Sequence, residues 1–110
     1  MKLFWSDINN NKYLLGELSK KDKIYFFEIN EDGLKLALKH GCFGIGRINI
    51  SKRINTSEYL FDFFKNRIPQ KDSPDIINFL HSIALEKYDE FEILKRTGGR
   101  LSTDRYFLCE

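Results

Sequence analysis

The segment of residues 59–64, with the sequence YLFDFF, places five large apolar side chains in six positions. On a helix with about 100° between successive residues, these side chains cover an arc of roughly 200°, and only Asp62 faces away. A surface helix needs an apolar arc of only about 100° to cover its own core. The segment must therefore either be enclosed on both sides by its own domain or offer one side to a partner.

The first half of the chain predicts strands followed by one helix. Three apolar-rich runs predict antiparallel strands at residues 2–6, 13–18 and 24–29. The asparagine-rich stretch 7–12 favours a hairpin loop between the first two. Asn30 is a candidate N-cap for a helix of about three turns, which Gly41 would end. Residues 43–54 alternate imperfectly and are expected to be extended or irregular.

Two helix starts are predicted in the second half. Asn55 and Glu58 have the spacing of a capping box for the aromatic helix, which Pro69 would end. Ser73 followed by Pro74 has the pattern of an N-cap and a first-turn proline. The apolar residues that follow recur at helical spacing, so a second helix is expected there.

The last part of the chain predicts a short helix and a returning strand. Asp89 and Glu92 form a possible capping pair for this helix. Gly98 and Gly99 would end it, because glycine enters the left-handed region without a Cβ clash. Residues 101–108 alternate loosely and are expected to return to the sheet as a strand.

Length and composition limit the class of protein. Residues 1–110 are enough for one domain with a single core, so we expect an α+β domain. It should contain a small, mainly antiparallel sheet with three to four helices packed against it. The chain is 42% hydrophobic and 31% charged, has no apolar run near the ~18 residues that cross a membrane, and has only two cysteines. These features predict a cytoplasmic protein without membrane contact.

The sequence contains no pattern that predicts catalysis or metal binding. Nucleotide-binding loops and kinase catalytic motifs are missing. His40, Cys42, His81 and Cys109 match no paired-ligand spacing. The helical neighbours of His81 are apolar, which suits a structural histidine better than a general base. We therefore expect no enzyme, no cofactor and no metal.

Basic residues gather in two segments. Arg47, Lys52 and Arg53 lie in a stretch, residues 41–57, that contains no acidic residue, and residues 95–105 carry four basic residues against one acidic residue. Both segments could converge on a phosphate-binding face. The net charge is only +2, however, so we expect little direct nucleic-acid binding by the isolated protein.

Three motifs resemble the N-terminal subdomain of HipA-type toxin kinases. Residues 60–69 resemble its FxxFFxNxLP helix and proline stop, and residues 88–100 resemble its DxFELL helix and Gly-Gly turn. Residues 15–18 are similar to its VGxL strand, and together the matches span about residues 13–108. Residues 100–105 are more basic than the usual DSxGAL continuation. In this they look more like the related domain beside HIRAN modules in some bacterial proteins.

The resemblance implies a first subdomain that works apart from its kinase. A HipA-type kinase is several times longer, and this chain has none of the motifs that phosphoryl transfer requires. In HipBST-like three-component toxin–antitoxin systems, such a piece is a small antitoxin. The resemblance thus implies a HipS-like antitoxin that inhibits a HipA- or HipT-like serine/threonine kinase, in a complex that can include a helix-turn-helix HipB-like repressor. The alternative is a nucleic-acid-associated accessory domain like those beside HIRAN modules.

The predicted partner surface combines the aromatic segment with the Gly-Gly turn. A wide aromatic arc beside an arginine has the composition of an interface hot spot. The predicted partner-binding residues are Phe61, Phe64, Asn66, Arg67, Ile68, Pro69, Gly98, Gly99 and Arg100. Phe64, Arg67 and Ile68 are expected to lead the contact, so alanine at Arg67 should hardly change the stability of the free protein.

Overall fold

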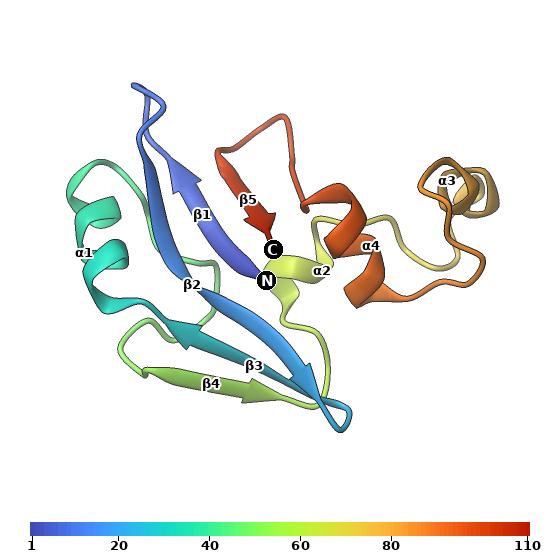
Figure 1. The fold of residues 1–110 in the computed structure, drawn as a ribbon, viewed down its shortest axis with the longest axis horizontal. Coiled ribbons are helices and arrows are strands. Elements are labelled where there is room, and N and C mark those ends of the chain that lie inside the picture. The colour runs from blue at the N-terminus through green and yellow to red at the C-terminus, as the bar shows by residue number, and fades with distance from the viewer.

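The computed structural model describes residues 1–110 as a five-stranded antiparallel sheet with four helices (Figure 1). The strands are β1 (Lys2–Ser6), β2 (Lys12–Lys21), β3 (Ile24–Ile29), β4 (Ile54–Ser57) and β5 (Tyr106–Cys109). The helices are α1 (Glu31–Lys39), α2 (Asp62–Lys65), α3 (Ile76–Ser82) and α4 (Glu90–Thr97). The strand order is β4-β3-β2-β1-β5, which places β4 and β5 at the two borders. The predicted α+β class and antiparallel sheet are confirmed.

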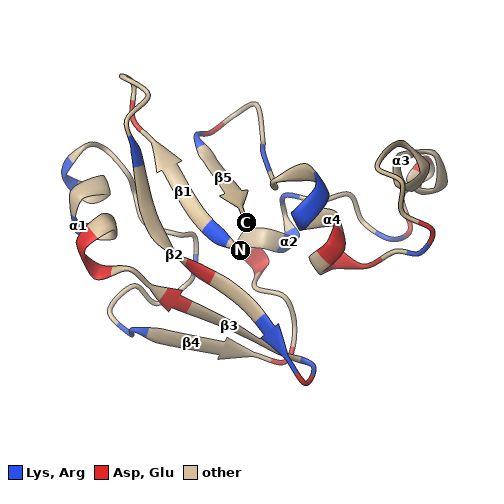
Figure 2. Cartoon of the chain, in the orientation of Figure 1, with Lys and Arg blue, Asp and Glu red and all other residues tan.

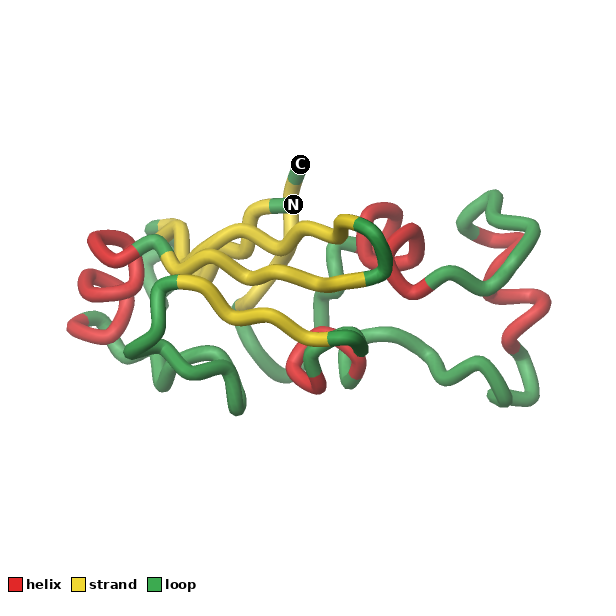
Figure 3. Tube along the Cα trace, turned by 90° about the horizontal axis from the view of Figure 1, so that it is seen from below, coloured by secondary structure: helices red, strands yellow, loops and turns green.

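The core lies between one face of the sheet and a layer made by α2 and the loop of residues 40–53 (Figure 3). Phe27 of β3 and Phe64 of α2 are both fully buried, and their ring centroids lie 5.7 Å apart. Ile45 of the loop is also fully buried. The helices α1 and α4 lie toward opposite ends of the sheet rather than beneath it. No helix is long and apolar enough to cross a membrane.

Two helices begin and end where the sequence predicts. The side chains of Asn30 and Asp89 each accept a hydrogen bond from the backbone amide three residues later, at 2.9 and 3.1 Å. Gly41 follows the end of α1 with a φ of 107°, and Gly98 follows α4 with a φ of 72°. Both values lie in the left-handed region that glycine enters most readily. Local chemistry therefore determines the limits of α1 and α4.

The predicted aromatic helix is much shorter than expected. Asn55 lies in β4 and pairs with Phe27, so the capping box with Glu58 does not form. Residues 58–61 are not helical, and α2 is a single turn that begins at Asp62. The reason is tertiary, because strand pairing holds Asn55 in an extended conformation that local spacing could not reveal.

The predicted start of the next helix is also wrong. Ser73 and Pro74 lie in a turn in which the Ser73 carbonyl accepts the amide of Ile76. Helix α3 begins at Ile76, and Asp75 before it makes no side-chain cap. Ala84, with a φ of 58°, follows soon after the helix ends. The apolar spacing did predict that a helix exists here, but not its length.

Asp7 organises the hairpin between β1 and β2. One carboxylate oxygen accepts the amides of Asn9 and Asn11 at 2.9 Å each, and the other accepts the hydroxyl of Tyr13 at 2.9 Å. Burial alone would raise the pKa of Asp7, but these hydrogen bonds outweigh it and lower the pKa to about 2. The charged form of Asp7 therefore stabilises the folded hairpin.

Stability should fall as the pH drops through the acid range. The pKa of Asp7 in the folded state, about 2, lies below its ordinary value of 3.8, so the unfolded chain binds the proton first. The contribution of Asp7 is complete above its ordinary pKa and is lost as the pH falls toward 2. Denaturant unfolding should show a shallower pH dependence for Asp7→Asn than for the unchanged protein over this window. Identical slopes would contradict the role given to the carboxylate.

Gly98→Val should lower the free energy of unfolding by about 1 kcal/mol or more. The backbone at this position is left-handed, and a Cβ there would lie 3.2 Å from the carbonyl oxygen of Leu108. Gly98→Asn is the matched control, because asparagine enters the left-handed region more readily than a β-branched residue. In thermal unfolding, the melting temperature should be highest with glycine at position 98, lower with asparagine and lowest with valine. An unchanged melting temperature for valine would be inconsistent with this conformation.

Candidate functional site

Arg67 joins the aromatic segment to the turn that contains Gly98 and Gly99. Its Nη1 donates a hydrogen bond to the carbonyl of Gly99 at 2.8 Å, and its Nη2 forms an ion pair with Asp104. Its guanidinium carbon lies 4.5 Å from the ring centroid of Phe63 and 5.1 Å from that of Tyr106. These contacts hold the exit of α2, the turn of residues 97–105 and β5 together. We call them the Arg67 node.

Burial changes the role of three predicted contact residues. Phe64 is fully buried, Arg67 is 7% exposed and Ile68 is 8% exposed. Their side chains are enclosed by their own domain in this conformation, and their part in a partner contact stays a prediction. For these side chains, the alternative of enclosure by the domain holds.

The other predicted site residues lie in different places. Pro69 is half-buried and its carbonyl accepts the hydroxyl of Tyr88 at 2.7 Å. Gly98 is half-buried and Gly99 is buried. Arg100 is exposed, and its guanidinium lies 4.3 Å from the ring centroid of Phe107. Successive residues of a strand face opposite sides of the sheet, so Phe107 draws Arg100 away from the face on which Tyr106 packs.

A surface groove lies beside the Arg67 node. It consists of two adjoining depressions of about 430 and 580 Å³, which share Arg47, Asp62 and Phe63. The first depression borders β4, and the second borders Arg67 and Asp104. We call the two together the aromatic groove, defined by the side chains of Arg47, Tyr59, Phe61, Phe63 and Asn66.

The aromatic segment serves the core and the groove at the same time. Leu60 and Phe64 are buried in the core, whereas Phe61 and Phe63 are half-buried along the groove. Tyr59 is 76% exposed. One side of the segment is therefore enclosed by its own domain, and the other side is exposed to solvent. Tyr59 belongs to the apolar run and could have been included in the predicted surface.

Tyr106 holds the floor of the groove in place. Its hydroxyl donates to the carbonyl of Gly44 at 2.6 Å and lies 3.6 Å from the sulfur of Cys42. Burial raises the pKa of Tyr106 and thus favours the protonated phenol that donates this hydrogen bond. Its ring packs edge-on against Phe63 at 5.0 Å between centroids. The loop of residues 40–53, α2 and β5 thus form one connected support.

Arg47 was missed as a site residue because only the fold brings it to the groove. It comes from the irregular loop before β4, yet it borders both depressions, together with Asp62. It belongs to the basic segment of residues 41–57. Arg47 could be predicted as a site residue only if one knew how the loop of residues 40–53 folds under the sheet.

Other basic residues are engaged within the domain. Arg53 forms an ion pair with Glu28 at 3.0 Å. Arg96 donates to the carbonyls of Ile83 and Ala84 at 3.0 Å each. Figure 2 shows basic and acidic segments interspersed along the chain. These contacts give no support to a single phosphate-binding face.

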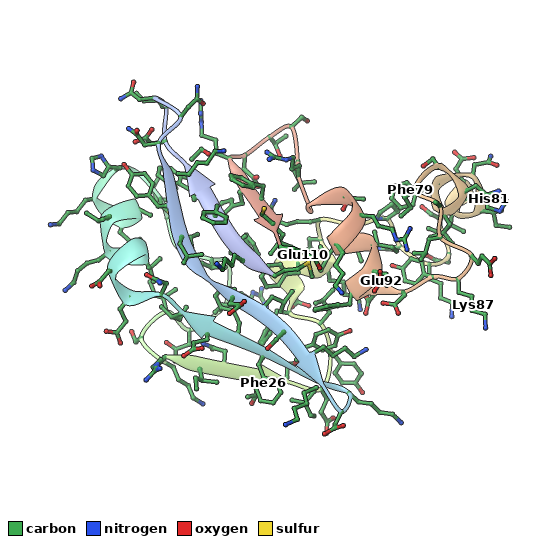
Figure 4. All side chains as sticks on the ribbon, viewed as in Figure 1. Phe26, Phe79, His81, Lys87, Glu92 and Glu110 are labelled. Atoms are coloured by element: carbon green, nitrogen blue, oxygen red, sulfur yellow. The ribbon has the colours of Figure 1, made fainter.

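The histidine considered for catalysis is remote from the groove. His81 is exposed on α3, which lies at the far end of the molecule from α1 (Figure 4). Its helical neighbour Ile77 is 66% exposed, so the expected apolar setting does not exist. Nowhere in the structure do three His, Cys, Asp or Glu side chains converge as a metal site would require. The groove is lined by aromatic and polar side chains.

In comparisons with known proteins, no family model, curated protein or solved structure matches this chain.

Arg67→Ala should lower the free energy of unfolding by about 2 kcal/mol or more. The change leaves the carbonyl of Gly99 without its donor and opens a void beside the rings of Phe63 and Tyr106. This replaces the earlier expectation of little effect. Arg47→Ala is the matched control, because this arginine is exposed on the same groove and should change stability by less than about 0.5 kcal/mol. If the two variants gave the same denaturation curve, the Arg67 node would not stabilise the domain as described.

Proposed function

We propose that this protein is a HipS-like antitoxin that binds and inhibits a separate HipA-like serine/threonine kinase toxin. The observation that carries the proposal is the aromatic groove, which lies in the segment that resembles the helix-and-stop motif of the HipA N-terminal subdomain. The turn that resembles the Gly-Gly motif adjoins the same place through Arg67. Two motifs far apart in the sequence thus contribute to one region.

The composition and rigidity of the groove favour protein recognition. Tyr59, Phe61 and Phe63 present aromatic surface beside Arg47, and interface hot spots are enriched in tyrosine, tryptophan and arginine. The Arg67 node fixes the groove from below, so little conformational freedom is lost when a partner binds. Exposed aromatic surface gains free energy when a partner removes it from water.

Inhibition can follow from two modes of binding. The antitoxin can plug the active site of the kinase, or it can hold the mobile loops of the kinase in an inactive arrangement. Both modes place the protein beside its kinase in the cytoplasm. A helix-turn-helix HipB-like repressor would complete the three-component system. Reading frames for a kinase and a repressor beside the gene of this protein would agree with the proposal.

Tyr59→Ala should weaken binding to the kinase encoded beside the gene of this protein by about 2 kcal/mol, or roughly 30-fold in Kd. It should also restore kinase toxicity on co-expression. Its stability should hardly change, because the side chain is 76% exposed. Ile77→Ala is the matched control, since Ile77 is also an exposed apolar residue but lies on α3, outside the groove. Titration calorimetry with the purified kinase measures the affinity.

A different result would relocate the surface. If Tyr59→Ala and Arg47→Ala both bind and neutralise the kinase as the unchanged protein does, the groove is not the kinase-binding site. The turn of residues 97–105, with Arg100 exposed on it, would then be the next surface to test.

A further inference from the structure

The border strand β4 runs beside the aromatic groove and has a partner on one side only. It pairs with β3, and no strand lies beyond it (Figures 1 and 3). Just before β4, the amide of Ile29 donates to the carbonyl of Arg53 at 2.8 Å. In an antiparallel pair, hydrogen-bonded and non-hydrogen-bonded residues alternate. This bond therefore sets the direction of every backbone group in β4.

In β4, two residues direct their backbone amides and carbonyls toward β3, and the other two direct them outward. Asn55 and Ser57 stand two and four positions after Arg53, so their amides and carbonyls face β3. The backbone amides and carbonyls of Ile54 and Thr56 point outward, toward the open border. No turn or side-chain hydrogen bond reaches their amides. Their side chains are exposed and uncharged.

The opposite border of the sheet is closed by the chain itself. The outward amide of Leu108 in β5 donates to the carbonyl of Gly98 at 2.8 Å, and that of Tyr106 donates to a carboxylate oxygen of Asp104 at 3.2 Å. Proteins usually protect a border strand with charges, proline or a covering segment. Ile54 and Thr56 provide none of these, and β-branched residues favour strand pairing. The two borders therefore differ in their readiness to accept another strand.

We propose that β4 accepts an extended segment of the partner as a sixth strand of the sheet. The inference rests on the proposed function, because it takes the kinase as that partner. Side chains of an added strand alternate between the two faces of the sheet. Every second side chain would lie on the face that holds Tyr59 and Phe61. The others would lie on the opposite face, beside Thr56 and Phe26. Figure 4 labels Phe26 at this border. Backbone pairing supplies affinity, and the groove supplies specificity.

Charge narrows the chemistry of the segment. Arg53 is paired with Glu28, but Arg47, which borders the first depression beside β4, and Lys52, which precedes the strand, form no ion pair within the domain. Residues 41–57 contain no acidic residue. An acidic residue of the partner would be favoured at this end of the added strand. Aromatic or aliphatic residues would be favoured at the positions that reach the groove. The occupant is therefore an extended, acidic and apolar segment rather than a helix.

Proline at position 56 tests the inference directly. Thr56→Pro removes an outward amide without removing a hydrogen bond to β3, since proline is tolerated where the amide of a border strand faces solvent. Thr56→Val is the matched control, because it keeps the amide and the β-branched shape. Calorimetry with the purified neighbouring kinase should show at least about tenfold weaker binding for proline and nearly unchanged binding for valine.

Amide hydrogen exchange gives a second measurement on the unchanged protein. Ile54 and Thr56 should exchange freely in the isolated protein and become protected in the kinase complex. Hydrogen exchange therefore tests strand addition to β4 even if Thr56→Pro fails to fold. Unprotected amides in a formed complex, or equal affinity of a folded Thr56→Pro, would overturn strand addition while leaving the antitoxin function intact. If the unchanged protein does not bind the kinase at all, the proposed function and the kinase as occupant of β4 both fall.

Discussion

The buried guanidinium of Arg67 is the interaction on which the candidate site depends. A charge in a protein interior is costly, and Nε of Arg67 is buried without an acceptor. The cost is offset by the carbonyl of Gly99, the carboxylate of Asp104 and the adjacent rings of Phe63 and Tyr106. A helical turn of four residues such as α2 is too short to be stable alone. The node holds α2 in place through contacts to the last part of the chain.

This arrangement explains how the domain can expose aromatic surface and still be compact. Leu60 and Phe64 anchor the aromatic segment from below, while Phe63 packs against both Arg67 and Tyr106. The segment does not need its outer side chains for the core, so Tyr59 is free to remain exposed. The apolar side chains, too many for one surface helix, are divided between the core and an exposed aromatic surface.

The sequence could predict what local chemistry decides. Asn30 and Asp89 cap helices because their partners lie three residues away, and Gly98 ends a helix through its own backbone freedom. The aromatic helix could not be predicted correctly, because Asn55 is held by a strand far away in the sequence. The burial of Arg67 was equally hidden, since the partner Asp104 lies 37 positions later. Long-range pairing decided both cases, and residue spacing carries no record of it.

The open border of β4 and the aromatic groove are contiguous, which bears on the kind of interface that the domain can form. A stable protein–protein interface buries about 800 Å² on each partner. The accessible surface of this domain is 7509 Å², so roughly a tenth of it would have to be covered. The groove alone is small, whereas a segment that pairs with β4 would extend contact along the border and both faces beside it. A backbone-directed contact also requires few specific side chains on the border itself, which agrees with the plain Ile54 and Thr56 found there. Specificity would then rest on the groove, whose shape depends on Arg67.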